Sequence, residues 1–512
     1  MPGVVTKRFR IHNAEQFHEA FSEAASTKMY MFIARVNSWD NGDTEPAPDD
    51  TIRESYYEPW RNMIAAKRVQ STDVSFCIPR YDWTTGTVYA EYDDSITTLY
   101  DGQFYVVTTD YNVYKCMFND RGATSTVKPT GTSTSIFQTA DGYKWKYMYS
   151  VSAADVLKFV TASYIPVKTL TSDDGSGQFD VQQAATNNSI DIIDVTANGA
   201  SYAFRANTLS GGVTNSTVVI LDSGASASDD AYTGSSIYIS AGLGAGQLAN
   251  VADYVGSSKT LTLSPAFATT PNTTSSYHIG PKVIITGDGV TDSAKAYANV
   301  AGGQITHINM INVGTGFSRA NVQISGTGGS GGKAVARISP PGGHGSDAVG
   351  ELGGYNVMLN VRLEGTEGGN FPTNNDFRII GILKDPLTSN DIAATTAAYD
   401  QTTKLTVSSI ASGPFFQDEI VTGTANGAIG RVVEFANTNA AGTAGVLSVV
   451  DVRGTFETET ITGNTTSATA TIGSIAAGEL KPFSGDIIYR ENRSVTSRSS
   501  DQVEDIKIVV RY

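Results

Sequence analysis

The chain is poor in the residues that build redox and metal sites. Only two cysteines, Cys77 and Cys116, and five histidines occur among its 512 residues. Two cysteines cannot supply a disulfide framework or a four-thiolate metal site. Both lie in apolar runs, "SFCIP" and "YKCMF", which predict buried thiols. Since the histidines are dispersed and no two have the spacing of a zinc motif, we expect no metal site and no cofactor.

Charge is also scarce, and most of it is acidic. Charged residues make up 17% of the chain, and 51 acidic residues outweigh 36 basic ones. A nucleic-acid binder normally carries a basic face, so this balance argues against a nucleic-acid partner. No apolar run reaches the roughly 18 residues of a membrane span. The first sixteen residues lack the apolar core of a signal peptide. The sequence therefore predicts a soluble, intracellularly made protein.

Catalytic motifs are hard to find. The Gly-rich stretch "GTGGSGGKA" from Gly326 resembles a phosphate loop, but Ala334 stands where a Ser or Thr would hold magnesium. Acidic clusters such as "EYDD", from Glu91 to Asp94, lie in predicted loops. They could form a glycosidase pair or bind calcium, but chance clustering among 51 acidic residues favours solvated loops. We expect no catalytic residues and no enzyme.

The chain is rich in strand and turn residues. Its 51 glycines and its Ser, Thr and Asn tracts favour strands and turns, and predict a mainly β fold with minor α structure. Asn13 and Gln16 resemble a capping box and predict a helix from Ala14 to Ala25. Apolar or alternating runs predict strands in "KMYMFIARV", "VSFCIP", "FYVVTTDYNVYKCMF" (a hairpin) and "YKWKYMYSV".

One turn stands out, in the stretch "CIPRYDW". Pro79 cannot donate to a sheet and should end its strand. Arg80 and Asp82 can form an ion pair across the turn, and Trp83 can cover the core. These residues predict a structural turn, since no base lies near Cys77 in the sequence.

Two pairs of segments repeat within the chain. "IIDVTANGASYAFRANT" parallels "INMINVGTGFSRANVQI", each with a glycine (Gly199, Gly314) three residues before an aromatic (Tyr202, Phe317). These glycines should adopt positive φ in a turn over which the aromatic closes. "FQDEIVTGTANGAIGRVVEF" and "FETETITGNTTSATATIGSI" repeat at an offset of 40 and predict small hairpin units.

These sequence patterns predict a discontinuous β-sandwich core with two inserted β-rich regions. The core comprises 1–174, 346–390 and the C-terminal strands of 479–512. The inserted regions are 175–345 and 391–478.

Several motifs, in order along the chain, resemble a baseplate wedge subunit of contractile-tailed phages related to the T-even coliphages. They span somewhat less than half of the chain, and the two inserted regions have no clear counterpart in the compact members of that family. The matching stretches are "FIARVNSWDNGDTEPAPDD", "CIPRYDW", "YKCM", "DGYKWKYMY", "YIPV", "SGDIIYRENR" and "DQVEDIKIVVRY", with a looser match in "NVMLNVRLEG…FRIIGILKDPL".

The resemblance implies a non-enzymatic structural protein of the virion, located in the tail baseplate and made in the host cytoplasm. It implies a homodimer within the wedge that joins other wedge proteins and takes part in baseplate assembly and rearrangement at host attachment. The residues expected to matter for structure or interfaces are Trp39, Pro79, Arg80, Asp82, Trp83, Trp145, Tyr489, Glu491, Asn492 and Arg493.

Two other functions remain open from the sequence. The first is a receptor- or glycan-binding tail module, with Tyr202, Tyr254 and Tyr277 exposed on the inserted region. The second is a cell-surface depolymerase that uses loop carboxylates.

Overall fold

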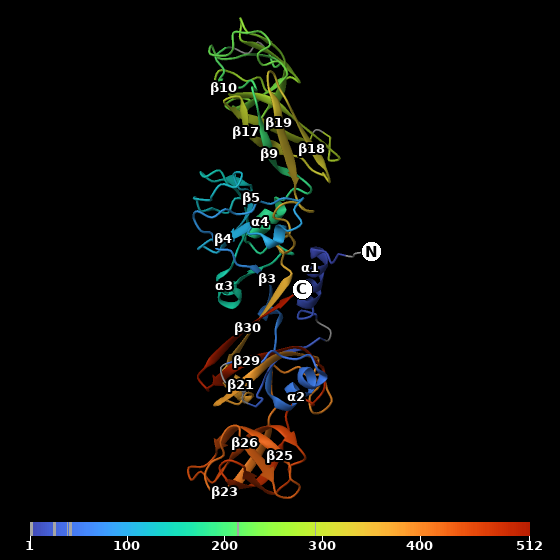
Figure 1. Cartoon of the computed structure of the whole chain (residues 1–512), viewed down its shortest axis with the longest axis vertical. Helices are drawn as coiled ribbons and strands as arrows, with labels where there is room; N and C mark the ends of the chain where they lie inside the picture. The colour runs from blue at the N-terminus through green and yellow to red at the C-terminus, as the bar shows by residue number, and fades with distance from the viewer. Residues whose placement is uncertain (1–3, 24–26, 38, 40–43, 212–214, 292) are drawn as a thin grey trace. The chain divides into compact units, whose positions relative to one another are not determined.

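Strands dominate the structure. The computed structural model describes residues 4–23, 27–37, 39, 44–211, 215–291 and 293–512. Strands account for 44% of the chain and helices for 10%, which confirms the predicted mainly β class. The chain divides into two units that are each built from distant segments (Figure 1). Unit 1 comprises 1–78, 154–166 and 354–512, and unit 2 comprises 79–153 and 167–353.

The first sheet of unit 1, here the β1 sheet, joins the two ends of the chain. Its strand order is β22-β2-β1-β21-β29, and every pair is antiparallel. All six residues of β1 are buried, which explains the unbroken apolar run "MYMFIA". The strands are β1 (Met29–Ala34), β2 (Met63–Arg68), β21 (Asn375–Lys384), β22 (Ala398–Asp400) and β29 (Asp486–Arg498).

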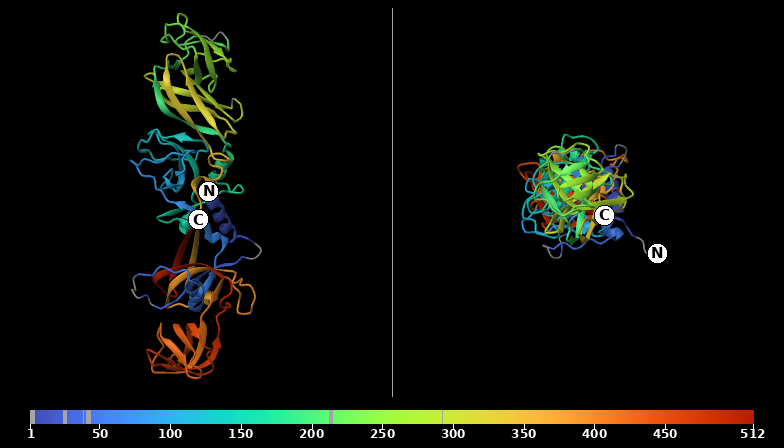
Figure 2. Two further views of the ribbon diagram at one scale, coloured as in Figure 1. Left: turned by 45° about the vertical axis from the view of Figure 1, so that its right-hand side comes forward. Right: turned by 90° about the horizontal axis from the view of Figure 1, so that it is seen from above.

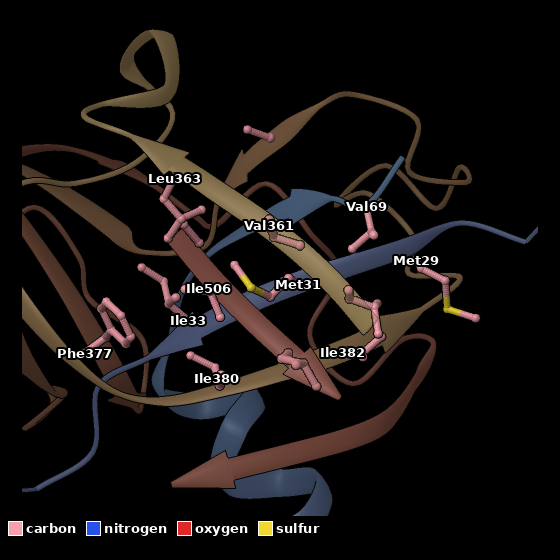
Figure 3. Close-up of a cluster of buried hydrophobic side chains, with 14 of the residues drawn as sticks. Met29, Met31, Ile33, Val69, Val361, Leu363, Phe377, Ile380, Ile382 and Ile506 are labelled. Atoms are coloured by element: carbon pink, nitrogen blue, oxygen red, sulfur yellow. The ribbon is translucent and has the colours of Figure 1, made fainter. Parts of the chain in front are cut away.

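The second sheet of unit 1, the β20 sheet, has the order β30-β20-β3-β8. Its strands are β3 (Val74–Pro79), β8 (Tyr164–Val167), β20 (Asn356–Glu364) and β30 (Val503–Arg511). Strand β3 ends at Pro79, as predicted. Figure 3 shows side chains from β1, β20, β21 and β30 pointing toward one another, among them Met31, Val361, Ile380 and Ile506. The main core of unit 1 therefore needs strands from both ends of the chain.

The N-terminal helix differs from its prediction. Helix α1 spans Lys7–Glu19, with Thr6 as N-cap accepting a hydrogen bond from the Phe9 amide. The proposed cap at Asn13 was wrong, because the Thr6 hydroxyl starts the helix two turns earlier. Ala24 and Ala25 lie outside the described residues. Ala14 is buried in the core of unit 1, so the helix packs through the centre of its length.

The other helices are short. Four further α-helices occur in the described chain, at α2 (Glu58–Asn62), α3 (Ala153–Phe159), α4 (Gly177–Gln183) and α5 (Ala348–Leu352). Single helical turns, three 3-10 and one π, occupy Ser71–Asp73, Leu99–Asp101, Glu367–Gly369 and Arg53–Tyr57. Helix α3 lies within "SAADVLKFV". Residues 44–50, which contain Pro46 and Pro48, are irregular, whereas 40–43 lie outside the described residues.

The second predicted repeat forms a closed barrel in unit 1, orange in Figure 1 and in the left view of Figure 2. Hairpins β24–β25 and β27–β28 correspond to the two repeats, which confirms the predicted hairpin units. Thr422 pairs with Thr462, its counterpart 40 residues on. The six strands are β23 (Thr403–Ala411), β24 (Ile420–Gly423), β25 (Ile429–Asn437), β26 (Ala444–Arg453), β27 (Thr460–Gly463) and β28 (Thr469–Ala476).

The first sheet of unit 2, the β7 sheet, has the order β4-β5-β7-β6. Strands β4 and β5 form the predicted antiparallel hairpin. An aromatic core that includes Tyr89, Tyr143 and Trp145 packs on this sheet. Its strands are β4 (Tyr105–Val107), β5 (Asn112–Phe118), β6 (Phe137–Gln138) and β7 (Lys144–Ser150).

Two further sheets complete unit 2. The β9 sheet has the order β16-β17-β9-β19, with β9 (Ile190–Ala200), β16 (Ala294–Ala301), β17 (Gln304–Val313) and β19 (Ser330–Ile338). The β15 sheet has the order β10-β15-β12-β13-β14-β11, and β18 also pairs with β15. Its strands are β10 (Arg205–Thr208), β11 (Val218–Ile220), β12 (Ser235–Ala241), β13 (Leu248–Val255), β14 (Thr260–Ser264), β15 (Ser276–Gly287) and β18 (Ala320–Ser325).

The Gly–aromatic repeat of unit 2 forms as predicted. Gly199 and Gly314 have φ of 61° and 63°. A Cβ atom on either glycine would lie within 2.8 Å of the ring of Tyr202 or Phe317. Each aromatic therefore closes over its glycine, and both rings are buried in one core cluster.

Candidate functional site

The ten candidate residues fall into two groups, one in each unit. The structure brings the first five together on β29 and the segment before α2: Trp39, Tyr489, Glu491, Asn492 and Arg493. The other five lie in unit 2, around the turn after β3 and on the β7 sheet: Pro79, Arg80, Asp82, Trp83 and Trp145.

Alternation along β29 sorts its polar side chains into two networks, because successive residues of a strand face opposite ways. On one face, Glu491 accepts a 2.6 Å hydrogen bond from the Tyr489 hydroxyl and pairs with Arg493 Nε at 3.0 Å. Burial raises the pKa of the Tyr489 phenol, and the Glu491 carboxylate raises it further. The phenol thus stays a hydrogen-bond donor.

On the other face, Arg490 links β29 to helix α2. Its Nη2 atom donates to Glu58 at 2.9 Å and to the Asn492 side-chain oxygen at 3.1 Å. The Arg490 side chain is 6% exposed, whereas that of Glu58 is 37% exposed. The guanidinium is therefore held inside the fold and cannot serve a partner directly.

The outer edge of β29 is covered by the chain's own N-terminal segment. Trp39 Nε1 donates to the Arg493 carbonyl at 2.9 Å, and Asn492 donates to the Pro46 carbonyl at 2.8 Å. Ser494 donates to the Glu45 carboxylate at 2.8 Å. β29 is an edge strand, and the Trp39 bond occupies one backbone carbonyl that could otherwise pair with another strand. The Asn492 and Ser494 contacts are made by their side chains.

The turn after β3 forms the predicted ion pair. Arg80 Nε lies 3.0 Å from both carboxylate oxygens of Asp82, and the Asp82 side chain is 55% exposed. The Trp83 amide donates to the Val107 carbonyl, and the Tyr105 hydroxyl donates to the Pro79 carbonyl at 2.7 Å. The turn is fixed against β4 and carries its charged pair toward the surface.

The two tryptophans of unit 2 differ in exposure and in bonding. Trp83 is partly buried against the aromatic core and donates to Ser125 at 3.1 Å. Trp145 is fully buried and stacks on Tyr143 with 5.5 Å between ring centroids. Since no solvent reaches Trp145, it can act on a partner only by shaping this core.

Asp141, from the "DGYKW" motif, organises the loop beneath Trp83. Its carboxylate accepts from Ser125 at 3.2 Å and from the amides of Thr126 and Val127 at 2.7 and 2.9 Å. Burial alone would raise the pKa of Asp141, but these bonds and one from Thr139 lower it below the usual range. The motif therefore specifies a loop conformation.

Both thiols are buried, as predicted. Burial raises the pKa of Cys77 to about 12 and that of Cys116 well above its ordinary value. At neutral pH neither thiol has an appreciable population of the nucleophilic thiolate.

Two expectations about exposed residues were wrong. Asp93 of "EYDD" is buried and lies 2.7 Å from Arg337, with Glu91 3.9 Å from the same guanidinium, so these carboxylates do not form a solvated loop. Tyr202, Tyr254 and Tyr277 are 3%, 1% and 1% exposed, because each ring packs into a core. The rings proposed to bind glycans are therefore not on the surface.

Sequence reasoning missed several buried charges. Lys115 and Glu351 form a fully buried ion pair in unit 2. In unit 1, Arg35 and Arg378 both bind Asp418. The available signal was a single charge inside an apolar strand run: Lys115 in "YKCMF", Arg35 in "FIARV" and Arg378 in "FRIIG".

Across the residues that the structure describes, no three His, Cys, Asp or Glu side chains gather as a metal site would need. No helix in the described part of the chain is long and apolar enough to cross a membrane. No protein-family model matches the sequence. No curated protein matches it significantly either.

Proposed function

We propose that this chain is a structural component of a contractile phage tail baseplate, a wedge subunit that joins neighbouring wedge proteins. In this role it is a homodimer within the wedge and takes part in baseplate assembly and in rearrangement at host attachment. The chain acts through surfaces and not through turnover.

One observation carries the proposal. The motifs that resemble the wedge family come from distant parts of the chain, and three of them form networks that specify structure: "SGDIIYRENR", "CIPRYDW" and "DGYKWKYMY". "YRENR" binds Trp39 and Pro46 beside the edge strand β29. "PRYDW" fixes a turn against β4. Motifs that fix loop and edge geometry fit a building block whose surfaces must match neighbours.

Immunoelectron microscopy of intact phage carrying a peptide tag on this chain tests the proposal. The expected result is label confined to the baseplate, with an untagged phage as the control. Label on distal fibres, or on no particle, would contradict it. Label on fibres would instead favour a receptor-binding module, which would need surface residues other than the three buried tyrosines.

A further inference from the structure

Unit 2 contains a cavity of about 460 Å³ between the β7 and β9 sheets. Its walls include Phe137 of β6, Lys144 and Lys146 of β7, Asp191 of β9, and His344. Cavities of roughly 300–1,000 Å³ are typical of small-molecule sites.

The first unusual feature is a pair of lysines on one face of β7. Lys144 and Lys146 are alternate residues, so both side chains lie on the same side of the strand. Lys146 donates to the Thr134 carbonyl, and Lys144 Nζ lies 5.8 Å from the centroid of the Phe118 ring. Burial lowers the pKa of both lysines. Among the described residues, no carboxylate lies within ion-pairing distance of either ammonium group.

The second feature is a buried histidine without a hydrogen-bond partner. His344 is 4% exposed, and neither ring nitrogen has a partner in the described chain. Nε2 is 3.9 Å from Asp191 and Nδ1 is 3.8 Å from Glu351, distances too long for hydrogen bonds. Burial lowers the pKa of His344, which favours the neutral ring with one N–H donor. A buried polar group left unsatisfied in this way is uncommon and points to a missing partner.

The charges around the cavity do not cancel. Asp191 is the one acidic residue among the described residues that line it, against Lys144 and Lys146. Glu351 lies behind His344 but is already neutralised by Lys115. Phe137 and Met310 add apolar wall. The cavity therefore offers both cationic and apolar groups.

We propose that this cavity binds a small organic anion: a carboxylate or phosphate group on an apolar body. The anionic group accepts hydrogen bonds from Lys144 and Lys146, and His344 donates its ring N–H to a ligand oxygen. The apolar body packs on Phe137 and Met310. Such a ligand supplies a counter-charge within ion-pairing distance of the lysines and a hydrogen-bond partner for the histidine.

Isothermal titration calorimetry on the full-length chain tests the proposal. The probes are benzoate and phenyl phosphate, with benzamide as a neutral control of similar shape. At least one anion should bind saturably with one site per chain, and benzamide should not. Failure of both anions to bind, or benzamide binding as tightly as benzoate, would overturn the proposal.

Variants locate the site. Lys144→Met should weaken anion binding about tenfold, as expected for loss of one charge-assisted hydrogen bond. Lys295→Met, at an exposed strand lysine of the same unit, is the matched control and should bind like the parent. Binding that is equal in both variants would place the anion elsewhere and reject this cavity. If Lys144→Met does not fold by circular dichroism, His344→Phe decides, because it keeps a ring against Tyr92 and removes only the donor.

Discussion

Lys115 and Glu351 show how single residues decide the stability of unit 2. The Lys115 ammonium pairs with one carboxylate oxygen of Glu351. The other oxygen accepts from the amides of Gly345 at 2.7 Å and Asp347 at 3.2 Å. Both side chains are at most 3% exposed, so neither charge has water to replace its partner.

Removing the Lys115 ammonium group should therefore destabilise unit 2 strongly. We expect Lys115→Met to lower the free energy of unfolding by about 3–5 kcal/mol, since it leaves a buried carboxylate unpaired. Lys128→Met is the control, because the Lys128–Asp110 pair is exposed and should contribute less than about 1 kcal/mol. Chemical denaturation measures both values. Equal small losses in the two variants would mean that Glu351 finds another partner.

The same pair predicts a pH dependence. Burial would raise the pKa of Glu351, but the Lys115 charge lowers it from 4.5 to about 2. A folded-state pKa below the unfolded value adds stability that is complete above pH 4.5 and is lost as the pH falls toward 2. The contribution is roughly 3 kcal/mol, since one pKa unit corresponds to about 1.4 kcal/mol.

Chemical denaturation of the parent and of Glu351→Gln at several pH values tests whether stability is lost as the pH falls. The stability advantage of the parent should shrink as the pH is lowered from 4.5 toward 2, because both side chains are then neutral. An advantage that stays constant over this range would contradict the lowered pKa.

Gly199 tests whether close neighbours of its backbone, and not only its φ angle, require a glycine. Gly199 and Gly302 have similar positive φ, 61° and 59°. A Cβ on Gly199 would lie 2.6 Å from backbone atoms of Ser330 and Gly332, whereas a Cβ on Gly302 would meet nothing within 4 Å. Left-handed backbone costs a residue with a Cβ about 1–2 kcal/mol.

We expect Gly302→Ala to lose about that amount, and Gly199→Ala to lose clearly more, because β19 must move away from β9. Thermal unfolding followed by circular dichroism measures the difference. Equal losses of stability in the two variants would show that the positive φ alone requires glycine at position 199. They would also show that β19 can move away from an added methyl group at little cost.

At the scale of elements, one repeat of the barrel is attached to the β1 sheet by charge. Asp418 accepts from Arg35 Nε at 2.9 Å and Nη2 at 2.7 Å, and from Arg378 at 3.3 Å. The arginine side chains are 1% and 3% exposed. At the equivalent position of the second repeat stands Thr458, which is exposed. The two repeats have the same fold. The acidic residue at this position distinguishes the first repeat, which binds the arginines of the β1 sheet, from the second.

Asp418→Ala should destabilise unit 1 by about 3–5 kcal/mol, because two buried guanidinium groups lose a shared carboxylate. Thr458→Ala is the matched control and should change stability by less than about 0.5 kcal/mol. Denaturant unfolding compares them. A mild effect of Asp418→Ala would mean that Asp376, which also binds both arginines, suffices alone.

Local patterns predict elements well where the cause is local. "VSFCIP" predicts β3 to the residue, because Pro79 cannot donate to the next ladder bond. The turn at Gly199 follows from the short distance between glycine and aromatic. The helix start at Lys7 was missed, because Asn13 and Gln16 resemble a capping box, whereas the Thr6 hydroxyl caps the helix.

For the whole molecule, the proposed role in assembly makes the Arg80 turn the place to test. The Arg80–Asp82 pair lies on a turn fixed by β4, with Asp82 facing solvent. We expect Arg80→Ala to weaken assembly with wedge partners about tenfold, the worth of one charge-assisted contact.

Co-purification with the partner wedge proteins, scored by mass photometry, measures that loss. Arg319→Ala, at an arginine whose side chain is 83% exposed, is the control and should assemble like the parent. An Arg80→Ala chain that assembles equally well would remove this turn from the interface.

The sequence by itself determined the β-rich class, the strands of its apolar and alternating runs, the two repeats and the buried cysteines. Each depends on alternation, apolar runs or glycine at a turn, and these causes act over a few residues. Tertiary structure alone decided that Trp39 covers the edge of β29, and that Tyr202 is buried. It also decided that Arg35 meets Asp418, 383 residues away. No local pattern specifies such partners, because the free energy of burying a charge or ring depends on which distant side chain arrives beside it.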